Sequence, residues 1–169
     1  MILFSYGSNM LSSRIGNRIQ SHIHLHVGCI ECHALRFHKV GQDTSGKADA
    51  YFTNNQNDIM WGVVGEINAS DKKIMDEIEG LGNGYNLKRV EVKVNDCSMV
   101  EAQAYIADHN YIDQSVKPFD WYKEFVYRGA LENKLPDHYV KYIETVDHRL
   151  DQNFARREEN FRIAKEVTL

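Results

Sequence analysis

Short apolar runs and alternating apolar and polar residues dominate the chain, and a few segments have helical spacing instead. Alternation and short apolar runs predict strands at residues 1–5, 23–37, 50–52, 61–67, 87–94 and 99–107. Apolar positions three and four residues apart predict helices at residues 10–20, 71–79, 119–130 and 137–147. Strands 50–52 and 61–67 are expected to pair across a turn at 54–58. Strands 87–94 and 99–107 are expected to pair around a turn near Asn95 and Asp96, and residues 41–49 to form a flexible polar connection.

Many strands interrupted by a few short helices predict an α+β fold, with a small mixed β-barrel flanked by short helices. A chain of 169 residues is long enough for one domain with its own core. We expect a single domain over residues 1–150. The remaining residues, 151–169, form a charged tail that is expected to be helical or loose.

The composition excludes some partners. Apolar residues make up 43% of the chain and charged residues 26%, and the net charge is −4. Such a balance gives no reason to expect binding to nucleic acid or to an anionic membrane. No apolar run approaches the ~20 residues of a membrane span. The apolar run at residues 1–4 lacks a basic segment before it, so we interpret it as a strand rather than a signal peptide and expect a cytoplasmic protein with reduced cysteines.

The helix at 71–79 is expected to be capped by Ser70 and to end at Gly80. Apolar residues on one side predict a buried face made of Ile74, Met75 and Ile78. Glu79 follows Met75 by four residues and is expected on the flank of that face, whereas Asp76 and Glu77 are expected to be solvated.

Glu79 is the candidate for acid–base chemistry. A carboxylate in the last turn faces the negative end of the helix dipole, where a basic side chain would be preferred. That position and partial burial both favour uptake of a proton, which is what a general base must do. From the residues alone, an ordinary surface acid at a frayed helix end is an equal alternative.

The turn Tyr6-Gly7-Ser8-Asn9, directly after the first strand, is the second candidate. Glycine, serine and asparagine at a strand end favour a tight turn that exposes backbone N–H groups. Such groups can hold an anion or a developing oxyanion. The alternative is that Ser8 and Asn9 only cap the helix that follows.

Taken in order, these motifs resemble the γ-glutamylcyclotransferase-like family, which includes AIG2-like proteins. The first strand runs into Tyr6-Gly7-Ser8-Asn9, a helix ends in Asp76-Glu77-Ile78-Glu79-Gly80, and Gly84-Tyr85 follows. Segments 61–64, 90–94 and 129–136 also look like the family, and the likeness extends from Leu3 to about residue 147. It is closest to the branch that acts on γ-glutamyl-amino acids.

The resemblance implies roles for individual residues. Glu79 matches the family's catalytic glutamate. The turn through Gly7 and Ser8 matches its substrate-binding loop, so substrate contacts are expected from Ser5, Tyr6, Gly7, Ser8 and Asn9. Tyr122 matches a substrate-contacting tyrosine. Two further tyrosines match aromatic positions near the family's pocket, Tyr85 and Tyr105.

The chemistry implied by the resemblance is intramolecular aminolysis of a small γ-glutamyl substrate. Glu79 would take a proton from the substrate's α-amine, which then attacks the γ-carbonyl and releases 5-oxoproline. Backbone N–H groups of the turn from Gly7 to Asn9 would hold the oxyanion. No metal or cofactor is required, and a homodimer stays open as the oligomeric state.

The segment Cys29-Ile30-Glu31-Cys32-His33 matches the pattern of c-type haem attachment. Three histidines precede it, so a metal site is an alternative: His22, His24 and His26. Haem attachment requires export, and no signal for it is present. We therefore expect a strand in which reduced cysteine acts as a small apolar residue, and no metal site.

Two other functions stay open. The fold could serve as a non-catalytic ligand-binding or interaction module, although a glutamate at position 79 argues against this. A related enzyme could instead cyclise γ-glutamyl-amines, such as isopeptide-linked lysine, or a γ-glutamylated biosynthetic intermediate. The preferred leaving group depends on the residues of the pocket walls, which cannot be located from the sequence alone.

Overall fold

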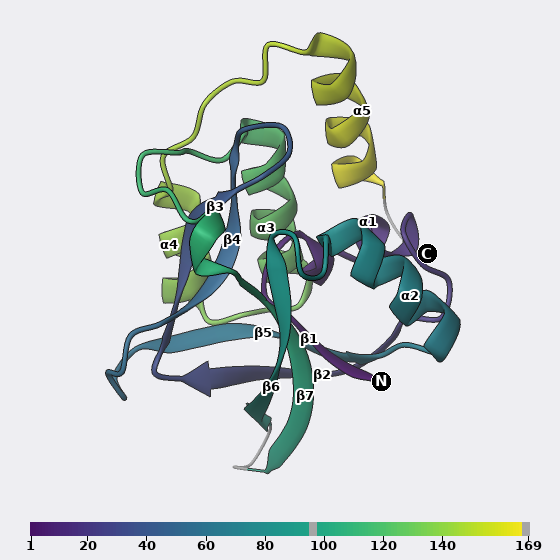
Figure 1. The fold of residues 1–169 in the computed structure, drawn as a ribbon, viewed down its shortest axis with the longest axis vertical. Coiled ribbons are helices and arrows are strands. Elements are labelled where there is room, and N and C mark those ends of the chain that lie inside the picture. The colour runs from purple at the N-terminus through teal and green to yellow at the C-terminus, as the bar shows by residue number, and fades with distance from the viewer. Residues whose placement is uncertain (95–97, 167–169) are drawn as a thin grey trace.

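The computed structural model describes residues 1–94 and 98–166. Within these residues the strands are β1 Ile2–Ser5, β2 Ile23–Glu31, β3 His33–Val40, β4 Gly46–Phe52, β5 Ile59–Glu66, β6 Tyr85–Val94 and β7 Met99–Ala107. A closed barrel has the order β1-β5-β2-β6-β7, and β3 and β4 form a separate two-stranded sheet (Figure 1). Barrel neighbours are antiparallel, except that β1 and β7 meet in parallel. The predicted α+β fold with a small mixed barrel is confirmed.

Helices cover the barrel on two sides. The helices are α1 Ser12–Gly16, α2 Ala69–Glu79, α3 Asp120–Glu132, α4 Asp137–Thr145 and α5 Phe154–Lys165. In the view of Figure 1, α3, α4 and α5 lie above the barrel, and α1 and α2 lie to its right. The helices predicted at 71–79, 119–130 and 137–147 are confirmed, and much of the charged tail is helical. The helix predicted at 10–20 is wrong in extent, because Leu11 is extended and separates a 3₁₀ turn at Ser8–Met10 from the short α1.

The strand pairing predicted between 50–52 and 61–67 is wrong. Ala50 pairs with Leu35 of β3, whereas β5 lies between β1 and β2. The cause is the turn at 41–45, in which the Gly41 N–H donates to the Ser45 carbonyl at 2.8 Å and returns the chain along β3. Consequently residues 46–49, expected to be flexible, belong to β4.

Two further expectations concern turns. The stretch 23–37 is not one extended segment, because Cys32 adopts a positive φ of 59° and separates β2 from β3. A positive φ turns the chain sharply, which moves β3 out of the barrel. The turn expected near Asn95 and Asp96 lies outside the described residues.

The cap of α2 differs from the prediction, while its end agrees with it. The side chain of Asn68, not Ser70, accepts from the Asp71 N–H at 2.8 Å. Ser70 instead donates its hydroxyl to the Asn68 side chain at 2.7 Å. At the other end Gly80 has a left-handed φ of 68° and terminates the helix, as expected.

The predicted apolar face of α2 is wrong for two of its three members. Met75 is fully buried, but Ile74 and Ile78 are 41% and 42% exposed. The helix is rotated because Asp71 is buried and accepts from the backbone N–H of Ser21 at 2.7 Å. Residues four positions apart lie on the same face of a helix. Asp71, Met75 and Glu79 have this spacing, so Glu79 also points inward.

Met75 belongs to a small apolar cluster between α1, α2 and the barrel. The cluster consists of Leu3, Ile15, Ile19, Ile67, Met75, Tyr85 and Tyr105. A larger core between the barrel, β3, β4 and α3 also includes Ile163 and Ala164 of α5. Because the smaller cluster contains two of the candidate tyrosines, the packing of α2 and the position of these rings are connected.

We expect Met75→Ala to lower the free energy of unfolding by about 2–4 kcal/mol, since it removes a fully buried side chain and leaves a cavity. The matched control is Ile74→Ala on the exposed side of the same helix, with an expected loss of less than about 1 kcal/mol. Urea denaturation of both variants measures the difference. Equal losses would contradict the orientation of α2.

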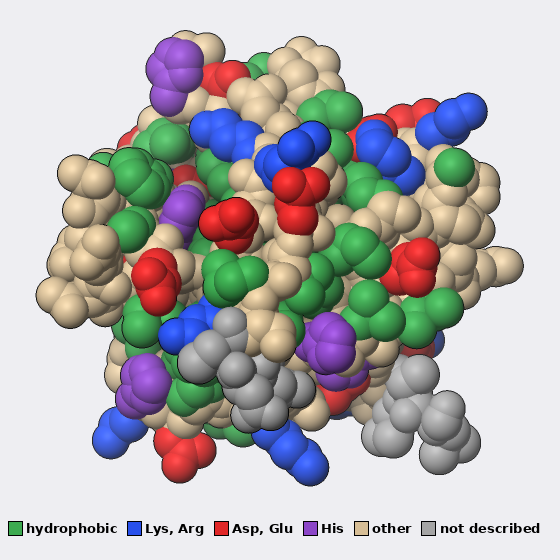
Figure 2. Space-filling view, turned by 90° about the horizontal axis from the view of Figure 1, so that it is seen from below, with side chains coloured by type: hydrophobic (Ala, Val, Ile, Leu, Met, Phe, Trp, Pro, Cys, Tyr) green, Lys and Arg blue, Asp and Glu red, His purple; other side chains and the backbone are tan. Residues whose placement is uncertain are grey.

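The face shown in Figure 2 mixes acidic and basic side chains with apolar ones. Charges of opposite sign that are interspersed in this way do not build the one-signed field that attracts a polyanion. Within residues 1–94 and 98–166, no helix has both the length and the apolar composition to cross a membrane.

Candidate active site

A small cavity of about 40 Å³ lies where β1 ends, next to the last turn of α2. It brings together all nine residues singled out from the sequence: Ser5, Tyr6, Gly7, Ser8, Asn9, Glu79, Tyr85, Tyr105 and Tyr122. The remaining lining residues are Leu3, Phe4 and Ala48. Segments far apart in the chain therefore converge on one space, which we call the inner cavity.

Glu79 is held at the inner cavity through one of its two carboxylate oxygens. Its Oε1 accepts from Asn9 Nδ2 at 3.0 Å and from Arg18 Nη1 at 2.8 Å. Arg18 also donates to Asn9 Oδ1 at 2.7 Å, which closes a triangle of polar side chains. The side chain of Glu79 is only 16% exposed. Its Oε2 accepts no hydrogen bond from the described residues, so this oxygen is available to a ligand.

The turn after β1 lines the same cavity and carries backbone N–H groups without a partner among the described residues. Ser8 and Asn9 start a 3₁₀ turn, so their N–H groups have no acceptor within it. No other acceptor for them exists in the part of the chain that the structure describes. Gly7 approaches β4 closely, because a Cβ added there would lie 2.9 Å from the Cβ of Ala48. Glycine at this position therefore lets the turn press against the cavity wall.

Two tyrosine hydroxyls are fixed by the backbone of one residue in β4. Tyr85 donates to the Ala48 carbonyl at 2.6 Å, and the Tyr122 hydroxyl accepts from the Ala48 N–H at 3.1 Å. Burial raises the pKa of both Tyr85 and Tyr122, so these phenols stay neutral. They supply a rigid, uncharged wall next to the carboxylate.

The other two tyrosines connect β7 to the turn and to α2. Tyr6 donates its hydroxyl to the backbone carbonyl of Tyr105. The Tyr105 hydroxyl donates to Asp76 Oδ1 at 2.7 Å, and Lys72 binds the other oxygen of Asp76 at 2.5 Å. The expectation that Asp76 is solvated is wrong for this reason, whereas Glu77 is exposed as expected. These bonds hold the end of α2, and with it Glu79, against the barrel.

A second hollow of about 290 Å³, the outer pocket, adjoins the inner cavity. The two spaces share Ser8, Glu79, Tyr85 and Tyr122. Four basic residues line the outer pocket as well: Arg14, Arg18, Lys39 and Lys47. None of the four stood out in the sequence, since no local pattern marks them and their convergence depends on how β3, β4 and α1 pack together.

Lys47 has its charge compensated within the outer pocket. Its ammonium donates to Asp43 at 2.7 Å and to the Ser45 hydroxyl at 2.6 Å, and it lies 4.7 Å from the ring centroid of Tyr122. Burial lowers the pKa of Lys47 to about 8, against the opposing effect of Asp43. This lysine therefore stiffens the turn between β3 and β4 and supports the tyrosine wall.

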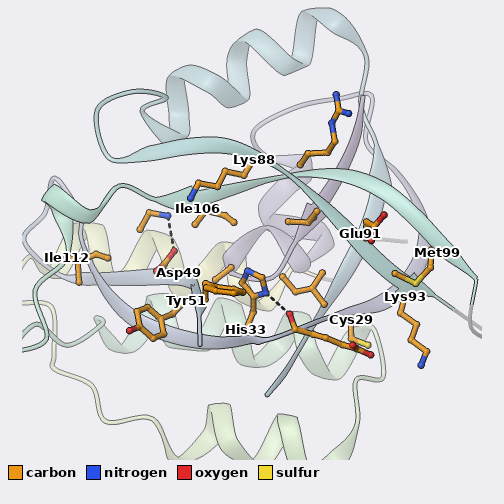
Figure 3. A pocket seen from close by; sticks show the side chains of 17 residues that line it. Cys29, His33, Asp49, Tyr51, Lys88, Glu91, Lys93, Met99, Ile106 and Ile112 are labelled. Atoms are coloured by element: carbon orange, nitrogen blue, oxygen red, sulfur yellow. Dashed lines mark hydrogen bonds between the residues drawn. The ribbon is translucent and has the colours of Figure 1, made fainter. Parts of the chain in front are cut away.

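A larger hollow of about 890 Å³ lies elsewhere, between β2, β4, β6 and β7 (Figure 3). It contains none of the nine candidates, although Cys29 and His33 line it. His33 Nδ1 donates to the Glu31 carbonyl at 2.7 Å, as Figure 3 shows, and Cys29 and Cys32 are free thiols. Among the described residues, no cluster of three or more potential ligands for a metal ion is found.

Comparisons with known proteins identify the family of this chain. Residues 59–143 match the AIG2-like family. The human protein named gamma-glutamylcyclotransferase is 30% identical over 151 residues, which cover 86% of this chain and 78% of the human one. The mouse protein of the same name is 29% identical over 151 residues, again 86% of this chain and 78% of the mouse one. A solved structure named gamma-glutamyl cyclotransferase superposes with a TM-score of 0.83 at 26% identity and covers 98% of each chain. The chain belongs to the γ-glutamylcyclotransferase family of enzymes.

Proposed function

We propose that this enzyme closes the ring of a γ-glutamyl group and releases 5-oxoproline together with a free amine or amino acid. The observation that carries the proposal is that Glu79 and the turn after Gly7 line the same small cavity, and that among the described residues neither Glu79 Oε2 nor the N–H groups of that turn have a partner. A base and an oxyanion site on one cavity are the two groups that intramolecular aminolysis needs.

The reaction begins with the substrate's own amine. At pH 7 this amine is mostly protonated, because its pKa is ~8. Glu79 takes one proton through Oε2, and the freed nitrogen attacks the γ-carbonyl carbon to form a five-membered ring. Neither Ser8 nor Tyr6 is needed as a nucleophile. Holding the γ-glutamyl group in its folded conformer supplies part of the rate through proximity.

Collapse of the tetrahedral intermediate completes the reaction. The oxyanion accepts hydrogen bonds from the N–H groups of the turn, and the bond from the γ-carbon to the leaving nitrogen breaks. Glu79 returns its proton to that nitrogen and then carries a second proton to it from the ring nitrogen. The lactam nitrogen keeps one of its three original protons, and the amine departs as an ammonium with the other two. No enzyme group is changed at the end.

The sizes of the two spaces support an orientation for the substrate. At ~10–15 Å³ per water, the inner cavity holds about three water molecules, which suits only the reacting part of the substrate. The outer pocket of about 290 Å³ begins at Glu79 and takes the leaving group. Arg18 and Asn9 both bind Oε1 and thereby direct Oε2 toward the reacting amine.

The test is release of 5-oxoproline by the purified enzyme, measured by liquid chromatography and mass spectrometry. The substrates are γ-glutamyl-alanine, γ-glutamyl-ε-lysine and glutathione. We expect release from γ-glutamyl-alanine without added metal or cofactor. Absence of release from all three would contradict the proposal and favour a ligand-binding module.

A further inference from the structure

The outer pocket contains a cation that forms no ion pair with the residues that the structure describes. Lys39, on β3, is only 8% exposed. Its ammonium lies 4.6 Å from the ring centroid of Tyr85. It forms no hydrogen bond or ion pair with any residue in 1–94 or 98–166. Lys39 Nζ is not among the fully buried polar atoms of the described residues that lack a partner, so the ammonium stays accessible from the pocket. An accessible ammonium without a carboxylate partner is suited to bind an anion.

Two of the other three basic residues of the pocket are paired with carboxylates. Arg18 is paired with Glu79 at 2.8 Å, and Lys47 is paired with Asp43 at 2.7 Å. Arg14 forms no ion pair with the described residues, and its Nε is buried without a hydrogen-bond partner there, but the side chain is held over the ring of Phe125 and donates to an asparagine side chain of α5 at 3.3 Å. Lys39 and Arg14 are therefore the two basic residues of the pocket without a carboxylate partner among the described residues. Arg14 is held between Phe125 and α5, whereas the ammonium of Lys39 makes no hydrogen bond within residues 1–94 and 98–166, so Lys39 is the better placed of the two to bind a ligand.

Two observations support an anion at this place. Gly84 stands beside the ammonium, and a Cβ there would lie 2.9 Å from Lys39 Nζ, so glycine keeps the space open. Burial lowers the pKa of Lys39, and the opposing effects of Glu79 and Asp43 do not offset it. The protein's own acids therefore leave the ammonium short of negative charge, which an incoming carboxylate would supply.

We propose that Lys39 binds the carboxylate of the leaving amino acid and thereby selects γ-glutamyl-α-amino acids over γ-glutamyl-amines. This inference rests on the proposed function. Lys39 lines the outer pocket and is absent from the lining of the inner cavity, where the ring closes. The leaving group extends from the γ-carbonyl past Tyr85 into the outer pocket, where its carboxylate meets the ammonium.

Two substrates that differ only in this carboxylate provide the test: γ-glutamyl-alanine and γ-glutamylethylamide. We expect the wild-type enzyme to have a kcat/KM at least about tenfold higher for γ-glutamyl-alanine, because a charge-assisted hydrogen bond is lost with the other substrate. In Lys39→Met we expect this preference to disappear, because kcat/KM falls for γ-glutamyl-alanine and stays unchanged for γ-glutamylethylamide. Lys39→Arg keeps most of the preference, since it keeps the charge.

The matched control is Lys88→Met, which removes an exposed lysine outside both spaces and leaves the substrate ratio unchanged. Equal rates of the wild-type enzyme on both substrates would overturn the inference, as would a loss in Lys39→Met that is the same for both. If Lys39→Met does not fold, the inference is tested by the ratio of kcat/KM for the two substrates in the wild-type enzyme and in Lys39→Gln. Failure of the wild-type enzyme to release 5-oxoproline from either substrate would instead contradict the proposed function.

Discussion

We expect Glu79→Gln to lower kcat for 5-oxoproline release by about 10²–10⁴-fold, the usual contribution of a general base. Glutamine has nearly the shape of glutamate and keeps an oxygen for Arg18 and Asn9, but it cannot take up the proton of the substrate amine. KM changes much less than kcat, because the cavity wall stays in place. Steady-state kinetics with γ-glutamyl-alanine measure both constants.

Glu77→Gln is the control for this experiment. Glu77 has the same charge and lies on the same helix two residues earlier, but it is exposed and lines neither the inner cavity nor the outer pocket. Its replacement is expected to leave kcat within about twofold, as is typical of a surface substitution. A Glu79→Gln variant that retains activity within a few-fold of wild type would remove Glu79 from the reaction.

Gly7→Ala is expected to lower kcat by about 10²-fold, the cost of losing one oxyanion donor or of moving the reacting groups by about 1 Å. The new methyl group would lie 2.9 Å from the Ala48 Cβ and 3.4 Å from the Tyr122 hydroxyl. The turn must therefore shift, and its N–H groups leave the place where the oxyanion forms. Kinetics with γ-glutamyl-alanine at saturating substrate measure the loss.

Gly16→Ala provides the matched glycine substitution. A Cβ at Gly16 in α1 meets no atom within 4 Å, so no displacement is expected and kcat stays within about twofold. Circular dichroism establishes that both variants fold. Full activity of Gly7→Ala would show that the close approach of this turn to β4 has no part in catalysis.

Most of the fold could be predicted because each strand and helix has its own local apolar period. The pairing of β4 with β3 could not be predicted. It depends on the backbone hydrogen bond from Gly41 to Ser45, which the pattern of apolar residues does not reveal. The orientation of α2 was mispredicted for a similar reason. Apolar spacing favoured Ile74 and Ile78, but the hydrogen bonds of the buried Asp71 outweigh it.

The candidate site could likewise be predicted only in part. The turn from Tyr6 to Asn9 and the helix end at Glu79 are contiguous motifs, so they can be recognised in a linear sequence. Arg18 and Lys39 stand alone between ordinary residues, and they reach the site only through tertiary packing. Sequence reasoning could therefore identify the reacting end of the site but not the wall that faces the leaving group.

The central claim is that the substrate's own amine, and not water, displaces the leaving group. Turnover of γ-glutamyl-alanine in ¹⁸O-labelled water tests it directly, because the two routes leave different products for mass spectrometry. We expect 5-oxoproline without ¹⁸O, formed in equal amounts with alanine, and no such product from Glu79→Gln. Glutamate that carries ¹⁸O in its γ-carboxylate would contradict it.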